Sequence, residues 1–483
     1  MAFLTGGANS ADSVLYSIEN SIRWEDGSSP KLSDDIASTS ASWTFSAWVK
    51  RGDVWDANSY IISWGTSGTD GTGIGFADDN KFFYYSEDSP NILIESARIY
   101  KDPSGWYHCV VKCDSGTVTL YINGASVASG SGGNALDSST VRIGCWVGDN
   151  LFHDGYLSEV YFIDGTAYSA STFGKSDSAS GIWIPKNASP TYGTHGFRME
   201  FKQTGTGTNA SGMGADTSGN DNHFAVSNLV AIDIVTDTPT NNFCVINPLF
   251  DSQGSAAGTP LDVVLTNGNL SVDVDGIGSN LNWAVMSTFG FASGKWYYEF
   301  KYDNPGNGNL FGGNPTISPN GTTIGRDGGT FVGSTHGLSG RAGNSNSRGI
   351  AGHESTSGII SDFYNETFPF DADNDIAGMF INMDDKELII HQNGSLVTGT
   401  GKGDWSSSNL YYQGGIVSSF WQTRLRVTDD DQGPGGTYNF GNPPYALSSG
   451  NADANGYGNF EYDPAIGGVN YYALCTKNLA EFG

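Results

Sequence analysis

Apolar and polar residues alternate along most of the N-terminal third of the chain. In residues 43–50, one face carries Trp43, Phe45 and Val49, which is the two-residue period of a half-buried β-strand. Residues 117–122 alternate in the same way and lead into Asn123-Gly124, a pair that favours the positive φ angles of a tight hairpin turn. Similar apolar runs occur at 60–64, 81–85, 106–113, 141–147 and 155–163. Short strands at this spacing predict a β-sandwich or barrel.

Helical periodicity is nearly missing from the sequence. No segment carries a sustained 3.6-residue apolar stripe or a heptad repeat, and residues 169–173 are expected to form one helical turn. The pattern therefore excludes a long coiled-coil stalk.

A second β region follows a polar middle. Residues 202–222 consist mainly of Gly, Thr, Ser, Asn and Asp, which predicts an exposed loop or linker. Strand patterns resume near Val263, and the stretch 304–358 is so rich in Gly, Asn and Ser that short strands or large loops are expected there. The clearest later strand patterns lie at 295–302, 375–381 and 387–391.

One internal echo relates the two β regions. The order strand, Asn-Gly, strand at residues 120–127 recurs at residues 390–397. Two sandwiches of related architecture explain the echo, and a chance similarity between hairpins is the alternative.

Composition and charge narrow the functional classes. The chain has 483 residues, of which 67 are glycine and 13% are aromatic, so it is turn-rich and well supplied with core residues. The net charge of −28, from 51 acidic and 23 basic residues, argues against nucleic-acid binding and against anionic membranes. The sequence contains no run of about 18 apolar residues, which a membrane-spanning helix would require. The first residues lack the basic region and the apolar core of a secretory signal.

Catalytic and thiol chemistry find little support. Cys109 and Cys113 share a face of one predicted strand and lie about 13 Å apart, beyond disulfide reach, so both are expected in the core. Glucanases of the sandwich type use Glu-x-Asp-x-x-Glu on one strand. Glu461-Tyr-Asp463 begins this pattern, but Ile466 stands where the last Glu is required. We therefore assign no catalytic residue and expect no enzymatic activity.

Several segments resemble known β-sandwich families. The segments GWYHCVV (105–111), VTLYING (118–124) and FHDGYLSEVYF (152–162) resemble the laminin-G-like branch of the concanavalin A-like lectin/glucanase fold, over about residues 10–185. The segments GKWYYEF (294–300), IAGMFINMDDKEL (376–388) and YNFGNPPY (438–445) resemble a SPRY domain.

The connecting segments carry a more specific resemblance. The segments concerned are IWIPK (182–186), YGTHGF (192–197), DTSGNDNHF (216–224), VTDTPTNNF (235–243) and YALCTKNL (472–479). In these segments the chain is similar to a family of tailed-phage virion proteins of the marine phage type, and residues 204–213 depart from that family as an apparent Gly/Thr insertion.

Calcium is the one cofactor that the laminin-G-like resemblance leaves open, because such domains often hold it at a loop rim with carboxylates and carbonyls. The run beginning at Asp371 lacks the Gly and Glu that an EF-hand requires, and solvated acidic loops are the alternative throughout. The candidate ligands are Asp78, Asp79, Asp371, Asp373, Asp375, Asp429, Asp430 and Asp431.

Glycan binding would require aromatic platforms on a shallow surface. Core packing is the alternative for every aromatic residue that the sequence offers, so the ligand-binding residues stay open. The candidates are Trp55, Trp146, Trp405 and Trp421.

These observations predict an all-β chain of two concanavalin A-like (jelly-roll) sandwiches, at 1–185 and 261–483, joined by an extended Gly/Thr/Asn-rich connector at 186–260. The resemblance implies a phage virion structural protein, assembled in the host cytoplasm, that serves as a tail or fibre component and presents a glycan-binding face to the host. A capsid or head decoration protein with an assembly role and a virion-associated glycan-degrading enzyme remain alternatives. The expected partners are other virion proteins, a host-surface polysaccharide and further copies of the chain.

Overall fold

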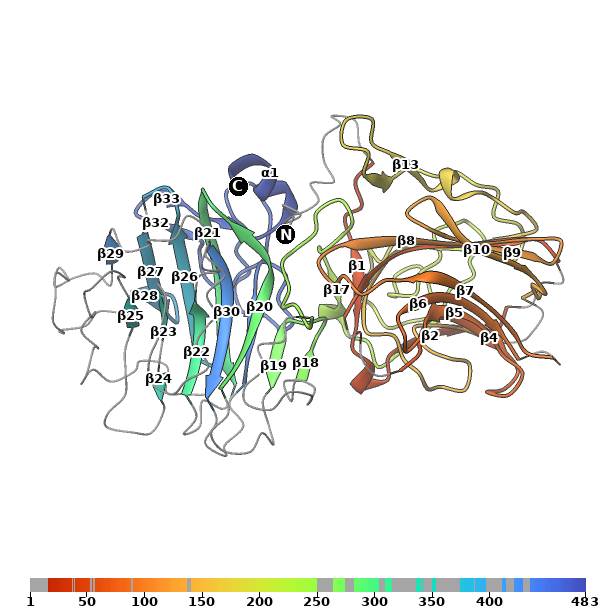
Figure 1. Ribbon diagram of the computed structural model, residues 1–483, viewed down its shortest axis with the longest axis horizontal. Coiled ribbons are helices and arrows are strands. Elements are labelled where there is room, and N and C mark those ends of the chain that lie inside the picture. The colour runs from red at the N-terminus through yellow and green to blue at the C-terminus, as the bar shows by residue number, and fades with distance from the viewer. Residues whose placement is uncertain are drawn as a thin grey trace. The chain divides into compact units, whose positions relative to one another are not determined.

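The computed structural model describes most of the chain. It covers residues 16–249, with short gaps at 37, 39, 53, 55–56, 88–89 and 137–139, and residues 264–303, 374–396 and 435–483, with gaps at 274–281 and 386. It also gives the strands at 309–314, 336–338, 340–341, 350–352, 411–413 and 421–428. The chain separates into two compact units, the N-terminal unit Gly7–Asn242 and the C-terminal unit Phe243–Gly483 (Figure 1).

The N-terminal unit consists of two antiparallel sheets. Sheet A has the order β10 (Ala125–Ser131), β9 (Thr117–Ile122), β8 (Trp106–Asp114), β3 (Trp43–Arg51), β12 (Gly155–Asp164), β1 (Ser21–Trp24) and β17 (Ile234–Val235), with β15 (Phe197–Met199) paired to β12. Sheet B has the order β16 (Ala225–Ser227), β2 (Lys31–Asp34), β11 (Thr140–Ile143), β4 (Ser59–Gly65), β5 (Thr72–Phe76), β6 (Lys81–Ser86) and β7 (Ile92–Ile99). A small hairpin of β13 (Gly174–Ser176) and β14 (Trp183–Pro185) completes the unit, together with the 3-10 turns η1 (Asp26–Ser28), η2 (Ala170–Thr172) and η3 (Ala231–Asp233).

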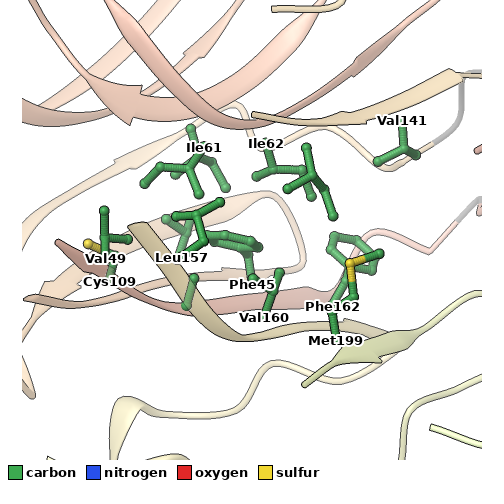
Figure 2. Close-up of a cluster of buried hydrophobic side chains, with 14 of the residues drawn as sticks. Phe45, Val49, Ile61, Ile62, Cys109, Val141, Leu157, Val160, Phe162 and Met199 are labelled. Carbon is green, nitrogen blue, oxygen red and sulfur yellow. The ribbon is translucent and has the colours of Figure 1, made fainter. Parts of the chain in front are cut away.

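The apolar face of each strand points into the space between the two sheets. Phe45 and Val49 from β3 and Leu157 from β12 meet Ile62 from β4 there (Figure 2). Cys109 also lies in this core, and all five cysteines of the chain are buried and form no disulfide. The predicted sandwich, its alternating strands and the core role of Cys109 are confirmed.

Turn residues match the predicted hairpins. Asn123 and Gly124 have φ angles of 49° and 79° and join β9 to β10. Strand β11 ends at Ile143 instead of continuing to 147, because Gly144 has a φ of 89° and a side chain there would strike the ring of Trp24.

Residues 186–242 differ from the connector that their composition indicates, because they pack onto the sandwich. Strands β15, β16 and β17 extend the two sheets. Isolated apolar residues such as Phe197, Met213 and Phe224 reach the core from a polar background. Such single anchors give no periodic signal in the sequence. The rest of the expected connector lies largely outside the described residues.

The C-terminal unit also has two main sheets. Sheet C has the order β18 (Val264–Thr266), β19 (Ser271–Asp273), β31 (Gly435–Asn439), β21 (Lys295–Asp303), β26 (Ile376–Asn382), β27 (Glu387–Gln392) and β28 (Ser395–Leu396), with β29 (Tyr411–Gln413) beside β27 and β34 (Tyr472–Ala473) parallel to β21. Sheet D has the order β20 (Asn282–Phe291), β30 (Trp421–Thr428), β22 (Asn309–Asn314) and β24 (Gly340–Arg341). Two small pairs are β23 (His336–Leu338) with β25 (Ile350–Gly352), and β32 (Ala465–Ile466) with β33 (Val469–Asn470).

Aromatic side chains dominate the core of the C-terminal unit. Trp296, Tyr298 and Phe300 alternate along β21 and pack with Phe291 of β20. The described part of the chain contains one α-helix, α1 (Thr476–Phe482). Among the described residues, no helix has the length and apolar character needed to span a bilayer.

Candidate metal centre

Three acidic side chains meet at one edge of sheet A. Glu25 and Asp26 follow the end of β1, and Asp154 directly precedes β12. The two strands pair with Trp24 opposite Gly155, so the register brings together the residues just beyond them. One oxygen from each carboxylate lies within 4.8 Å of the other two. We call Glu25, Asp26 and Asp154 the acidic cluster.

A glycine makes room for the most buried member of the acidic cluster. Strand β3 ends with Arg51 opposite Gly155, and the next residue, Gly52, donates its N–H to the carbonyl of Asp154 at 3.2 Å. A Cβ atom at position 52 would overlap the Asp154 carboxylate. Three chain segments therefore converge on Asp154, which is only 7% exposed, whereas Asp26 faces solvent.

The chemistry of the acidic cluster fits a hard divalent cation. Calcium prefers six to eight oxygen ligands in flexible arrangements, and carboxylate-only sets select calcium or magnesium over softer metals. Carboxylates this close repel one another, and a cation between them would reduce that repulsion. Glu25, Asp26 and Asp154 would hold the ion, with backbone carbonyls or water as the remaining ligands, and the ion would supply charge neutralisation and order to the adjoining turns.

Of the acidic residues selected from the sequence, the three that the structure describes, Asp78, Asp79 and Asp375, do not gather in this way. Asp79 pairs with Lys81 at 2.7 Å, and the hydrogen bond from Lys81 lowers the pKa of Asp79. Asp375 is buried and accepts hydrogen bonds from Asn393 at 2.7 Å and Gln392 at 3.2 Å. Asp78 is exposed, and its backbone N–H donates to Asn58 Oδ1 at 3.1 Å. Asp371, Asp373, Asp429, Asp430 and Asp431 lie outside the described residues.

Of the candidate aromatic platforms, the structure describes the side chain of Trp146 alone. Trp146 is only 5% exposed and packs against Tyr60 with a ring separation of 4.7 Å, so the core-packing alternative holds for it. Trp421 belongs to β30. Its side chain, together with Trp55 and Trp405, lies outside the described residues.

A buried histidine on the outer face of sheet A serves packing. His108 lies between the rings of Trp48 and Trp183, at 4.7 and 6.0 Å. Trp183 Nε1 donates to His108 Nδ1 at 3.0 Å, so the Nε2 atom carries the proton and donates to Ser46 at 2.9 Å. Burial lowers the pKa of His108 to about 3, which keeps the ring neutral.

Next to His108, a buried carboxylate is fully engaged. Glu159 stands at a β-bulge with a φ of 49°, and it accepts hydrogen bonds from Tyr16 at 2.7 Å, Tyr161 at 2.5 Å and Arg198 at 3.1 Å. The small pocket that Glu159 and His108 border leaves no room for a water molecule. This arrangement is a structural network, and it offers no space for a substrate.

The sequence matches one protein family over part of its length. Residues 25–172 match the family described as the concanavalin A-like lectin/glucanases superfamily. The matched segment lies inside the N-terminal unit and includes all three residues of the acidic cluster. Among curated proteins, no sequence matches the chain.

The solved structures similar to parts of this chain include the following three. A heptameric SAP-like pentraxin from Limulus polyphemus has 19% identity and a TM-score of 0.26, with 32% of this chain and 80% of that chain covered. A putative carbohydrate binding protein from Bacteroides ovatus has 14% identity and a TM-score of 0.30, with 44% and 59% covered. The SPRY domain of human HERC1 has 13% identity and a TM-score of 0.23, with 37% and 91% covered. None of these similarities assigns a function to this chain.

The acidic cluster escaped prediction for an identifiable reason. The sequence search favoured acidic residues that are consecutive or alternate, whereas the cluster combines residues 25–26 with residue 154 through strand register. The usable signal is an acidic residue beside glycine at the adjoining ends of two predicted strands. Glu25-Asp26-Gly27 and Asp154-Gly155 both have this form.

Proposed function

We propose that the chain is a structural protein of a phage virion, a tail or fibre component, whose N-terminal unit binds a host-surface glycan with calcium held by the acidic cluster. The observation that carries the glycan part is the match of residues 25–172 to a lectin/glucanase family, in a unit whose register assembles Glu25, Asp26 and Asp154.

Binding without cleavage is the form of this activity that we favour. Glycoside hydrolysis requires two carboxylates that flank the sugar bond in an accessible cleft. Glu159 is enclosed by Tyr16, Tyr161 and Arg198 with no room beside it for water. The carboxylates of the acidic cluster converge on one point, which suits a shared ion better than a bond held between them.

The virion part of the proposal depends on the sequence. The connecting segments resemble those of tailed-phage virion proteins, and a net charge of −28 suits a surface that stays soluble at high local density. The described part of the chain contains no helix longer than α1, so a compact appendage fits better than a coiled-coil shaft.

The glycan part is tested by binding the full-length chain to an array of purified bacterial surface polysaccharides, in calcium and in EDTA. We expect binding to at least one polysaccharide in calcium and at least tenfold weaker binding in EDTA or for Asp154→Asn. The matched control is Asp221→Asn, since the Asp221 side chain is 89% exposed. Binding that is equal in calcium and EDTA would remove the ion from the proposal, and release of shortened oligosaccharides would favour the enzyme.

The virion part is tested by cryo-electron microscopy of the intact phage particle. Density for the chain on the tail supports the proposal. Density at symmetric positions on the shell favours capsid decoration, and absence of the chain from the particle rejects both virion roles.

A further inference from the structure

A buried lysine of β3 contacts both an acid and an amide from the end of the N-terminal unit. Lys50 Nζ lies 2.7 Å from Asp237 Oδ2 and 2.8 Å from Asn242 Oδ1. The side chains of Lys50 and Asp237 have no exposed surface, and Asn242 is 6% exposed. Lys50 and Asn242 are 192 residues apart in the sequence, so only the fold brings them together.

The surroundings of these three residues are apolar and fix their orientation. Trp106 Nε1 donates to Asp237 Oδ1 at 3.2 Å, and Lys50 Nζ lies 5.4 Å from the centre of the Tyr156 ring. Trp106 and Tyr156 belong to one buried cluster with Trp48. The amide of Asn242 is held at its other end, because Nδ2 donates to the carbonyl of Ser104 at 2.6 Å. Its Oδ1 atom is thereby directed at Lys50.

We propose that Lys50 and Asn242 form an intramolecular isopeptide bond, with Asp237 relaying the protons. The contacted atom Oδ1 is bonded to Cγ at about 1.23 Å, so a small rotation of the lysine side chain places Nζ at the distance of about 3–3.5 Å from which attack begins. A nucleophile, an electrophile and a proton carrier are thus held together in a site closed to water.

The reaction is balanced without an outside reagent. Lys50 passes one ammonium proton to the Asp237 carboxylate, and the lone pair of Nζ forms a bond to Asn242 Cγ. Asp237 then transfers a proton to Nδ2 and accepts one from Nζ. The carbonyl re-forms, the Cγ–Nδ2 bond breaks, and ammonia leaves as a neutral molecule while Asp237 keeps the remaining proton. One secondary amide replaces one primary amide, and the two opposite charges of the starting pair are both gone.

Burial favours this reaction over a persistent ion pair. Two buried charges carry a large desolvation cost that their mutual attraction repays only in part. The first proton transfer converts both groups to neutral forms, and the product holds a neutral amide opposite Asp237. Fixed positions also remove the entropic cost of bringing the reactants together.

The bond would tie β3 to Asn242, the last residue of the N-terminal unit. It would close a loop of about 190 residues, and cross-links that close long loops restrict the unfolded chain most strongly in the chain-entropy account. A protein that bears load on a particle surface would gain resistance to being pulled open from this end.

The decisive experiment is mass spectrometry of the denatured full-length chain. We expect the intact mass to fall below the sequence mass by one ammonia molecule. We also expect a tryptic digest to contain a branched peptide that joins Lys50 to Asn242, without cleavage after Lys50. Full mass with two linear peptides would overturn the proposal. Loss of water with a branch at Asp237 would show that the acid, not Asn242, is the acyl partner.

Variants separate the bond from other sources of ammonia loss. Succinimides at Asn-Gly pairs such as Asn123-Gly124 also release ammonia, but they do not depend on Lys50. Lys50→Arg keeps the positive charge and should restore full mass, as should Asp237→Ala, whereas the exposed control Lys175→Arg should still lose ammonia. An ammonia loss that is as large in Lys50→Arg as in the wild-type chain would assign the loss to succinimides and reject the proposal. If the buried variants do not fold, the branched peptide of the wild-type chain decides the question alone.

Discussion

Each of the two units contains a buried acidic side chain that holds a polar segment in place. The carboxylate has different partners in the two units. In the N-terminal unit, Asp237 contacts the ammonium group of Lys50 and the indole of Trp106. In the C-terminal unit, Glu299 accepts hydrogen bonds from the backbone N–H groups of Glu461 and Tyr462, at 3.1 and 2.9 Å. A segment with few apolar residues can therefore be fixed by one buried acid, through a charge in one case and through backbone donors in the other.

Mutation of Asp237, the acid that contacts Lys50, should lower the free energy of unfolding the most. Asp237→Ala leaves Lys50 buried without its carboxylate, and breaking a buried ion pair costs about 3–5 kcal/mol. The variant also cannot form the proposed bond to Asn242, so we expect urea denaturation of the full-length chain to show a loss of at least this size. The exposed control Asp221→Asn, which suits the φ of 59° at this position, should change the free energy of unfolding by less than about 0.5 kcal/mol. A loss below about 1 kcal/mol for Asp237→Ala would show that the segment is held mainly by other contacts.

Mutation of Glu299, whose carboxylate accepts hydrogen bonds from the backbone, should lower the free energy of unfolding by a smaller amount. Glu299→Ala leaves the backbone N–H groups of Glu461 and Tyr462 without an acceptor and removes one of the two acceptors of the Asn439 amide, and an unsatisfied buried group costs about 1–3 kcal/mol. We expect a loss of about 2–3 kcal/mol and faster hydrogen exchange at 459–462.

The conservative variant sharpens that comparison. Glu299→Gln retains an acceptor oxygen and should recover part of the loss. Equal losses for the Ala and Gln variants would mean that the charge of Glu299 matters more than its hydrogen bonds.

Lowering the pH should affect the stability of the two units differently, because protonation of a buried group destabilises one unit and stabilises the other. Burial lowers the pKa of His108 from 6.5 to about 3, so the unfolded chain binds the proton first and stability falls as the pH drops below 6.5. The slope is about 1.4 kcal/mol per pH unit between 6.5 and 3. Burial raises the pKa of Glu299 above its usual 4.5, so the folded chain binds that proton more tightly and stability falls as the pH rises through this range.

Hydrogen exchange measured at pH 6.5 and pH 5 reads each unit separately. We expect protection of β3 and β8 to fall at pH 5 while that of β21 falls less. His108→Gln should reduce the acid sensitivity of β3 and β8. The remaining sensitivity is expected from His153 of the same unit, whose pKa burial also lowers to about 3. An unchanged pH response in that variant would assign the sensitivity to other groups.

The sequence predicted the sandwich strands well and the acidic cluster not at all. Trp43, Phe45 and Val49 reach the core as their alternation requires, because a two-residue period is local information. The segment 186–242 shows no period, and it packs through single apolar residues such as Phe197 and through Asp237. The acidic cluster depends on strand register between residues 25–26 and 154, which no local pattern contains. Contacts that depend on pairing over more than a hundred residues were therefore missed, whereas strands and hairpins were found.

Calcium should give the smallest effect, and it acts on the N-terminal unit alone. An ion that binds only the folded state stabilises it by about 1.4 kcal/mol at ten times its dissociation constant. We therefore expect calcium to raise the melting temperature of the wild-type chain by a few degrees relative to EDTA, with the added protection confined to residues around β1 and the start of β12. Asp154→Asn removes one ligand charge and also relieves repulsion within the acidic cluster. The variant should thus match or exceed the wild type in EDTA and lose most of the gain in calcium, and Asp221→Asn should behave as the wild type does in both. If the variant is less stable than the wild type even in EDTA, Asp154 stabilises the fold through its hydrogen bonds at the strand ends. In that case the two units differ in how they bury acidic side chains, and metal binding is not part of the difference.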